Sequence, residues 1–459
     1  MFRVVRGELP ANAAGTVDLT VAGFGEVAGA IVFTGSALNG DNPASAPSPG
    51  WLCIGYYDGT NQICKAEHSL DAQSVTSDAW KYCWNDQIAG SVNTAGTEQD
   101  LYSCAKIANG IRITKDQSAA GTQWYVTAIL IPRAGVSDIK CAVMDWSGAV
   151  ADVAAVTVSD LGFEADLVFG MCGVNPGPNN LDESIQTGWG ITHNVDGTDA
   201  NIVQMSMGFG VNGGRDLTTV TTYTSLYVTD LYGISNCTNS ASIRYGARFS
   251  GFNANGFTIT KYSDTADPAP SAFTPLSSGA SFALAEDLLY LAMKFRGTPD
   301  IAIFHEVAPT ATGSFAVTHP GFRPAFGMMM TPDHTPATIN ATDTSAASGV
   351  GFCLFDENAQ YTIGYIDQDN VNTTSVVTWH QTGLQMYELA GNSKFTATLT
   401  SFDVNGWTWN FTDVDPSDAD NWIGFAISAN DAITLTDADG DETWPDGSTG
   451  LIATGTGFM

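Results

Sequence analysis

Carboxylates are the side chains most available for chemistry in this 459-residue chain, which has 48 acidic residues against 17 basic ones. The densest group runs from Asp437 to Glu442, where acidic residues at alternate positions could converge on a calcium ion. An EF-hand loop needs glycine at position six and glutamate at position twelve, but counting from Asp437 these are Glu442 and Ser448. We therefore expect a solvated acidic turn, with cation binding as the alternative. The same expectation applies to Asp413, Asp415, Asp418 and Asp420.

The sequence contains no motif that is typical of a known class of enzyme. Glycoside hydrolysis needs two positioned carboxylates, and no strand position is acidic in every part of the chain. One aspartate does recur, as Asp58, Asp196 and Asp356, but it falls in a turn, where its side chain bonds the local backbone. Nucleophile-elbow, zinc-protease and phosphate-cradling motifs are absent, and the six histidines are isolated. We therefore expect no enzymatic activity, no cofactor and no metal.

Two sets of aromatic residues alternate along a strand, so each set lies on one face of a sheet. They are Trp80, Tyr82 and Trp84 in one strand and Trp407 and Trp409 in the other. Flat aromatic rings can stack on sugars, which makes these the candidate binding residues, with a host surface glycan as the ligand. Packing in a core or at a subunit interface is the favoured alternative.

The elements that must position these residues are β-strands. Gly, Ser, Thr, Asn and Asp are abundant, whereas the Lys and Glu that cover the outer face of long helices are sparse. The hydrophobic fraction of 44% is that of a globular protein. A chain of this length suits about three domains of roughly 150 residues each.

Four signals recur three times in the same order along the chain. Each copy opens with a short apolar strand and continues with a Gly-Phe pair, at Gly23, Gly162 and Gly321. A glycine within an apolar strand follows, at Gly55, Gly190 and Gly351. The fourth signal is Asn-Gly before an alternating strand, at Asn109-Gly110, Asn255-Gly256 and Asn405-Gly406. Because Asn-Gly accepts positive φ at both centres of a type I′ turn, it predicts three β-hairpins.

These repeats predict an all-β chain of three tandem antiparallel β-sandwich modules of jelly-roll type. Module 1 is expected to span residues 1–133, module 2 residues 134–297 and module 3 residues 298–427. Residues 428–459 form a C-terminal extension, which we expect to act as a docking tail. Alternation along the strands predicts sheets with one buried and one wet face, and the short linkers predict modules packed in a fixed arrangement.

Charge and targeting signals bound the partners. The formal net charge of −31 opposes binding to nucleic acid or to an anionic membrane surface. The N-terminus has no signal peptide, and the longest apolar run, Trp124 to Ile131, is far too short to span a bilayer. We therefore expect a soluble product made in the cytoplasm, with its eight cysteines as reduced core thiols.

The ordered signals resemble the repeated β-sandwich structural proteins of tailed bacteriophage virions, especially those of marine bacteria. Gly321-Phe322-Arg323-Pro324 and Asn255-Gly256-Phe257-Thr258 match best, whereas the first two copies have Glu26 and Ala165 in place of the proline. The resemblance covers residues 1 to about 427 and consists of turns and strands.

This resemblance implies a structural protein on the outer surface of a virion, as a tail-fibre or baseplate component or a capsid decoration protein. It would be assembled in the host cytoplasm with other virion proteins, and a homo-oligomer such as a trimer fits this role. The alternatives are a carbohydrate-binding adhesin or receptor-binding protein and, less favoured, a polysaccharide-degrading enzyme.

Overall fold

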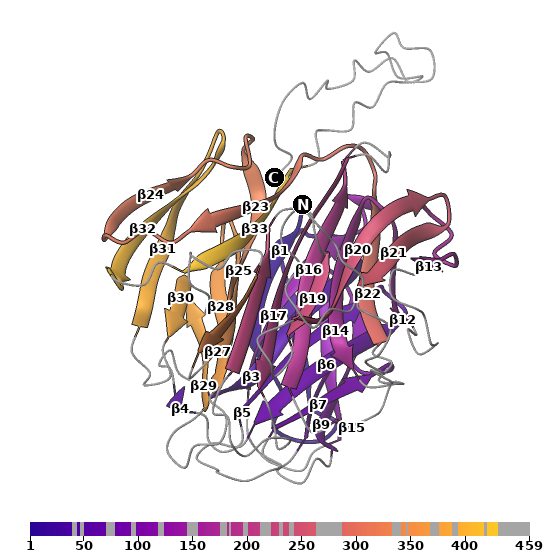
Figure 1. The fold of residues 1–459 in the computed structure, drawn as a ribbon. Helices are drawn as coiled ribbons and strands as arrows, with labels where there is room; N and C mark the ends of the chain where they lie inside the picture. Colours follow the sequence, from indigo (N-terminus) through magenta and orange to yellow (C-terminus); the bar gives the residue numbers. More distant parts are fainter. Residues whose placement is uncertain are drawn as a thin grey trace, which may run out of the picture.

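The computed structural model describes most of the chain as β-strands joined by turns. The described residues are 1–38, 44–45, 50–69, 79–92, 98–117, 124–144, 155–174, 181–182, 185–195, 201–211, 222–228, 233–237, 243–262, 287–332, 341–345, 348–367, 376–387, 393–416 and 420–429. All strand pairs within these ranges are antiparallel, so the predicted all-β class is confirmed (Figure 1). None of these residues belongs to a helix that could cross a membrane.

Each module is a sandwich of a seven-stranded and a four-stranded sheet, with one strand order used three times. The large sheet of module 1 contains β1 (Arg3–Glu8), β11 (Trp124–Pro132), β3 (Val27–Leu38), β5 (Gly50–Tyr57), β6 (Gln62–Ser69), β7 (Ala79–Trp84) and β15 (Leu181–Asp182). Its small sheet contains β2 (Thr16–Thr20), β10 (Gly110–Gln117), β9 (Glu98–Ile107) and β8 (Ala89–Val92).

Modules 2 and 3 repeat this order. The large sheet of module 2 contains β12 (Val136–Met144), β22 (Asp287–Phe295), β14 (Leu167–Val174), β16 (Ile185–Asn194), β17 (Ile202–Val211), β18 (Thr222–Tyr227) and β26 (Ala341–Ser345), and its small sheet contains β13 (Ala155–Val158), β21 (Gly256–Tyr262), β20 (Ile243–Asn253) and β19 (Ile234–Cys237). The large sheet of module 3 contains β23 (Ile301–Val307), β33 (Asn421–Ser428), β25 (Pro324–Pro332), β27 (Ser348–Asp356), β28 (Gln360–Asp367), β29 (Val376–Thr382) and β4 (Ala44–Ser45), and its small sheet contains β24 (Gly313–Val317), β32 (Gly406–Val414), β31 (Ser393–Asp403) and β30 (Leu384–Tyr387).

The seventh strand of each large sheet comes from the following module. Strand β15 of module 2 pairs with β7 of module 1, and β26 of module 3 pairs with β18 of module 2. Strand β4 of module 1 then pairs with β29 of module 3, which closes the exchange into a ring. The three modules are therefore linked cyclically by backbone hydrogen bonds, which the sequence analysis did not predict.

The Asn-Gly hairpins form in all three modules, but the predicted turn geometry is wrong. The two turn residues are Ala108-Asn109, Ala254-Asn255 and Val404-Asn405, and the glycine opens the next strand. Asn109, at φ 62°, is the one turn asparagine with positive φ. The glycine is needed for another reason. A Cβ on Gly110, Gly256 or Gly406 would overlap a backbone carbonyl of the adjacent strand β2, β13 or β24.

The Gly-Phe loop packs against this hairpin in each module. Its glycines adopt positive φ, at 73° for Gly23, 80° for Gly162 and 75° for Gly321. The carbonyl of the turn asparagine accepts an N–H from the loop, donated by Val21, Leu161 and Gly321 in the three copies. Two signals far apart in sequence thus mark one contact, which explains why they recur together.

The third signal is equivalent in two copies only. Gly55 pairs with Val32 and Gly190 with Gly170, and a Cβ on either would overlap a carbonyl oxygen behind the strand. Sheet register places Cys353 at this position in module 3, two residues beyond the predicted Gly351. Its Sγ lies 3.6 Å from the carbonyl oxygen of Gly383, a residue with φ 84°. At this position, modules 1 and 2 therefore have a glycine that leaves room for a carbonyl oxygen, whereas module 3 has a cysteine whose thiol contacts one.

One hydrophobic core is shared by all three large sheets. Strand β5 illustrates how the sheets are buried on both faces, because Trp51 and Cys53 face the small sheet of module 1, whereas Leu52 and Ile54 face the shared core. The prediction of one wet face per sheet is therefore wrong for the large sheets. The small sheets lie on the outside, with β24, β32 and β31 on one side of Figure 1 and β20, β21 and β13 on the other.

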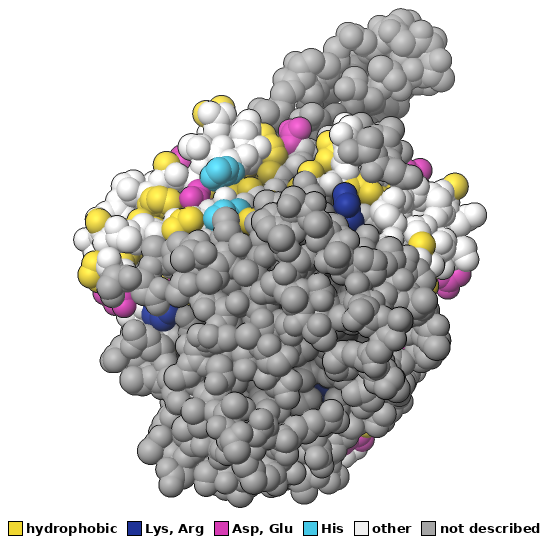
Figure 2. Space-filling view, in the orientation of Figure 1, with side chains coloured by type: hydrophobic (Ala, Val, Ile, Leu, Met, Phe, Trp, Pro, Cys, Tyr) yellow, Lys and Arg dark blue, Asp and Glu magenta, His cyan; other side chains and the backbone are white. Residues whose placement is uncertain are grey.

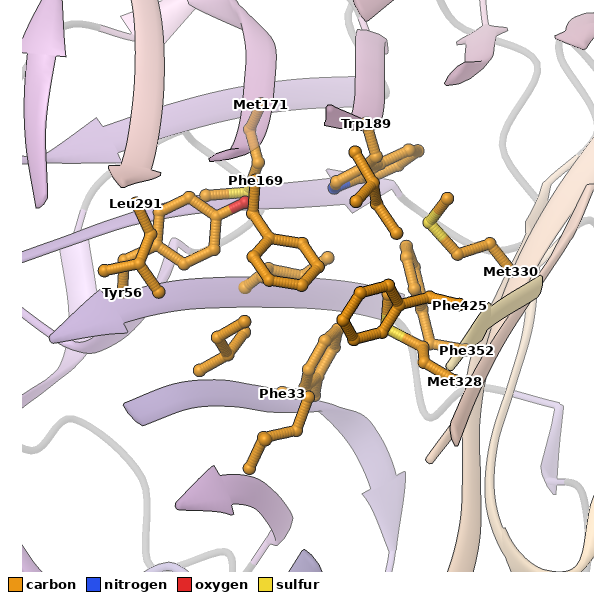
Figure 3. Packing of buried hydrophobic residues seen from close by; sticks show 14 of the residues in the cluster. Phe33, Tyr56, Phe169, Met171, Trp189, Leu291, Met328, Met330, Phe352 and Phe425 are labelled. Carbon is orange, nitrogen blue, oxygen red and sulfur yellow. The ribbon is translucent and has the colours of Figure 1, made fainter. Parts of the chain in front are cut away.

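Aromatic and methionine side chains from the three modules meet in this shared core (Figure 3). Phe352 of module 3 packs against Phe33 of module 1 and Trp189 of module 2, with ring centroids 5.3 and 5.4 Å apart. Phe169 of module 2 and Phe425 of module 3 meet edge to face at 5.4 Å. A cavity of about 20 Å³ remains among these side chains and is lined by apolar residues. Since fully burying one such side chain contributes about 1.5–3 kcal/mol, this core binds the modules together strongly.

Candidate functional site

The candidate sugar-binding aromatics are mostly core residues. Trp84 is buried between the sheets of module 1, and Trp407 and Trp409 are buried between those of module 3. Tyr82 is partly buried, and its ring centroid lies 4.3 Å from that of Trp84. The side chain of Trp80 lies outside the described part of the structure. For the three tryptophans, core packing is the role that the structure shows.

Other predicted features fall into two groups. The acidic run from Asp437 to Glu442, the docking tail beyond residue 429, and the aspartates 196 and 418 lie outside the described residues. Asp420 is described, and it is fully buried 3.5 Å from Lys394 Nζ. No group of three or more His, Cys, Asp or Glu side chains arranged to hold a metal occurs in the part of the chain that the structure describes.

The cysteines whose side chains are described are free thiols, as predicted. Six are buried and Cys104 is partly exposed. Burial raises the pKa of the Cys83, Cys104 and Cys141 thiols well above the ordinary value, so the reactive thiolate is disfavoured.

A buried carboxylate closes the junction between modules 3 and 1. Asp356, at the end of β27, accepts the backbone N–H of Val4 in β1 at 2.8 Å. The same carboxylate accepts the N–H groups of Asn358 and Ala359 in its own turn, at 2.7 and 2.9 Å, and lies 4.0 Å from Arg3. Burial raises the pKa of Asp356, and these donors oppose that shift by stabilising the carboxylate.

The junction between modules 1 and 2 repeats this arrangement. Asp58, which follows β5, accepts the N–H of Cys141 in β12 at 3.1 Å and bonds the N–H groups of Thr60 and Asn61 in its own turn. The Cys141 thiol donates to the carbonyl of Asn61 at 3.4 Å. Val4 and Cys141 are themselves equivalent, since they pair with Ile129 and Leu291 of the closing strands. Turn chemistry therefore explains only part of the role of the recurring aspartate, because its carboxylate also accepts a hydrogen bond from the next module.

A glutamine near each junction braces the two sheets of a module. The side-chain carbonyls of Gln62, Gln204 and Gln360 accept the backbone N–H of Cys104, Phe249 and Leu399 in the small sheets, at 2.7, 2.9 and 2.7 Å. This glutamine was not among the residues predicted from the sequence. The available signal was the shared spacing of Asp58 with Gln62 and of Asp356 with Gln360, which is four residues in both copies.

The junction between modules 2 and 3 lacks the carboxylate. His193 pairs with Leu167 as Asp356 pairs with Phe326, so sheet register places a histidine where the other two modules have aspartate. The sequence-based match to Asp196 is therefore wrong, because the β16–β17 hairpin extends two residues further than its counterparts. His193 is 9% exposed, and among the described residues its ring makes no hydrogen bond. Burial lowers the pKa of His193 to about 4, against an opposing effect of Asp166, so the ring is neutral at pH 7.

A carboxylate is present nearby, but it bonds within module 2. Asp166 occupies the register position of Ala28 and Ala325 in the other modules. It accepts the N–H of Phe295 and an N–H of the Lys294 ammonium, both at 2.8 Å. The opening strand β23 of module 3, where Ile303 is equivalent to Val4 and Cys141, receives no bond from Asp166 or His193 among the described contacts.

A cleft lies at this junction. It has a volume of about 590 Å³ and is lined by Glu164, Asp166, His193, Asn194, Val195, Lys294, Phe295, Gly297, Thr298, Pro299 and Ile301. Two of them end β16, two end β22, two lie just before β14, and Ile301 opens β23 of module 3. Val195 is 51% exposed at its edge. The departure from the repeat thus coincides with an open, polar-lined space.

No protein-family model matches the chain, and no curated protein matches it.

Proposed function

We propose that this chain is a structural protein of the outer surface of a bacteriophage particle, either a tail-fibre or baseplate component or a capsid decoration protein. The observation that carries the proposal is the cyclic exchange of strands around one shared core. This arrangement fixes three sandwiches relative to one another, which is what a part that acts by assembly requires.

The distribution of chemical groups supports the same role. The features that recur in the modules are turns, sheet braces and junction contacts. Acidic side chains are scattered over the described parts of the face in Figure 2, and they keep such a part soluble before assembly. Buried free thiols suit assembly in a reducing cytoplasm.

The partners in this proposal are other virion proteins and further copies of the chain. Three modules of one chain already surround a common core, so one molecule supplies the arrangement that three separate sandwich chains would otherwise build. The homo-oligomer remains a prediction, and analytical ultracentrifugation of the purified chain measures it directly. The aromatic faces that motivated a carbohydrate-binding adhesin are buried at Trp84, Trp407 and Trp409, so no specific observation favours that alternative.

Mass spectrometry of purified particles tests the proposal. Lysate of the host that produces this chain is separated on a density gradient, and the chain is quantified in each fraction against the major capsid protein. We expect a constant ratio across the particle peak and labelling of the particle surface by antibodies raised against the chain. A chain that sediments apart from the particles would refute the proposal.

A further inference from the structure

The cleft at the junction between modules 2 and 3 contains a buried hydrogen-bond acceptor without a partner. Among the described contacts, the Glu164 carboxylate receives one hydrogen bond, from Asn194 Nδ2 at 3.3 Å. Asn194 is 4% exposed, and its Oδ1 atom has no hydrogen-bond partner. His193 also lines the cleft, and its ring makes no hydrogen bond among the described contacts. Buried polar atoms are normally paired, so the unpaired Oδ1 atom of Asn194, beside the Glu164 carboxylate, points to an absent donor.

The charges of the lining residues define the kind of donor. Glu164 and Asp166 are acidic, Lys294 is basic and His193 is neutral at pH 7. Lys294 lies 2.8 Å from Asp166 and neutralises that carboxylate, so Glu164 has no counter-charge among the described residues. The cleft therefore carries a net charge of about −1 inside a chain whose formal net charge is −31.

We propose that this cleft binds a protonated amine or guanidinium group, the chemistry of a lysine or arginine side chain. Such a group brings several N–H donors and one positive charge, which match the unpaired Asn194 Oδ1 atom and the charge of Glu164. The volume of about 590 Å³ accommodates a whole side chain of this type. The proposal goes beyond the particle role, since it concerns a site that modules 1 and 3 do not share.

The other modules supply the comparison that makes the site specific. Module 1 has Glu26 at the register position of Glu164, but Lys106 lies 3.4 Å from its carboxylate. Module 3 has Arg323 at this position, and it pairs with Glu357 at 3.5 Å. At the other two junctions the aspartate equivalent to His193 bonds the next module directly. Only module 2 combines an acidic residue without a counter-charge with an unbonded histidine among the described residues.

Binding of small probes to the purified full chain tests the proposal. The cationic probe is N-acetyl-arginine amide, and the control is N-acetyl-citrulline amide, which has nearly the same shape but no charge. Saturation-transfer NMR and isothermal titration measure both. We expect the arginine probe to bind with a Kd of about 1 mM and the citrulline probe at least tenfold more weakly. Putrescine and N-acetyl-lysine amide distinguish a free polyamine from a side chain as the preferred source of the amine.

Two variants and a matched control locate the binding. Glu164→Gln keeps the shape of the side chain and removes its charge, so we expect the arginine probe to bind about tenfold more weakly. His193→Phe keeps a ring without nitrogen atoms and should weaken binding several-fold. Glu26→Gln makes the same change at the equivalent position of module 1 and should leave binding unchanged. Circular dichroism shows that each variant is folded.

Three results would contradict the proposed cation site. Equal binding of the arginine and citrulline probes, no binding up to about ten times the expected Kd, or equal weakening by Glu26→Gln and Glu164→Gln would each overturn the site. These results concern the isolated chain. They leave the particle test unaffected, so the cleft proposal and the virion proposal can fail separately.

Discussion

The two closed junctions and the open one use the same backbone and differ in very few side chains. At the 3–1 and 1–2 junctions, Asp356 and Asp58 bond the opening strand of the next module. At the 2–3 junction the equivalent residue is His193, and the nearby carboxylate of Asp166 bonds its own module. A repeat can therefore keep the same strand pairing at every junction and still leave one junction without the carboxylate that bonds the next module.

The largest effect is expected where a closed junction is broken. Asp356→Ala removes the acceptor of three backbone N–H groups, from Val4, Asn358 and Ala359, at a residue that is 2% exposed. Each partly or fully buried donor left unpaired costs about 1 kcal/mol, so the free energy of unfolding should fall by about 3 kcal/mol. Urea denaturation followed by tryptophan fluorescence measures the change.

The neighbouring variant Glu357→Ala is the control for this prediction. Glu357 is 47% exposed in its side chain and pairs only with the exposed Arg323 among its described contacts. Exposed ion pairs contribute little, so its unfolding midpoint should stay close to that of the wild type. Equal midpoints for the two variants would show that the junction carboxylate does not hold modules 3 and 1 together.

The open junction should instead be sensitive to acid through His193. Burial lowers the pKa of His193 to about 4, from the ordinary 6.5 of the unfolded chain. The unfolded state therefore gains a proton first as the pH falls, and the stability present above pH 6.5 is lost between pH 6.5 and about 4. At pH 5 this loss amounts to about 2 kcal/mol relative to pH 7.5.

His193→Gln isolates this contribution from those of other buried histidines. Burial also lowers the pKa of His68, to about 3, so part of the acid loss persists in the variant. Denaturation at pH 7.5 and pH 5 should show a loss about 2 kcal/mol smaller for His193→Gln than for the wild type. His319→Gln, at a side chain 52% exposed, provides the control and should behave as the wild type. An unchanged acid loss in His193→Gln would contradict the buried, neutral ring.

The fold could be predicted from the sequence because its landmarks are local contacts. The Gly-Phe loop and the Asn-Gly hairpin recur since they touch each other in every copy, and a side chain on Gly110 or Gly256 would collide with the adjacent strand. The two-face burial of the large sheets was also encoded, in runs such as Gly50–Tyr57 where every residue is buried. Strands β4 and β15 are two residues long and carry no hydrophobic period, so their exchange has no sequence signal.

The candidate site could not be predicted in the same way. Counting along the chain matches Asp196 to Asp58 and Asp356, whereas pairing across the sheet matches His193. The difference arises because the β16–β17 hairpin is longer, and only the register with β14 reveals it. Similarly, alternation placed Trp407 and Trp409 on one face correctly, but it could not tell a core face from a binding face.

A transplant of the closed pattern into module 2 should have a smaller effect. Asp166→Ala with His193→Asp gives module 2 the alanine and aspartate that modules 1 and 3 have at these positions. The new carboxylate would accept the N–H of Ile303, the residue equivalent to Val4. We expect the double variant to be about 1–2 kcal/mol more stable than Asp166→Ala alone, which a double-mutant cycle by urea denaturation measures. A double variant no more stable than Asp166→Ala would mean that the extended hairpin, rather than the side chain, keeps this junction open.

The smallest effect is expected for an ion pair that lies within one module. Arg112 and Asp18 form two hydrogen bonds across β10 and β2, at 2.6 and 2.8 Å, but both side chains are more than two-fifths exposed. Asp18→Asn should leave the midpoint of thermal unfolding nearly unchanged, because water replaces the lost contacts and salt screens the charges. The comparison with Asp356→Ala then separates the number of hydrogen bonds from their burial. Both carboxylates accept more than one hydrogen bond, but only that of Asp356 is buried and bonds a second module. A loss for Asp18→Asn as large as that for Asp356→Ala would show that hydrogen bonding to a carboxylate, wherever it occurs, matters more than the junction.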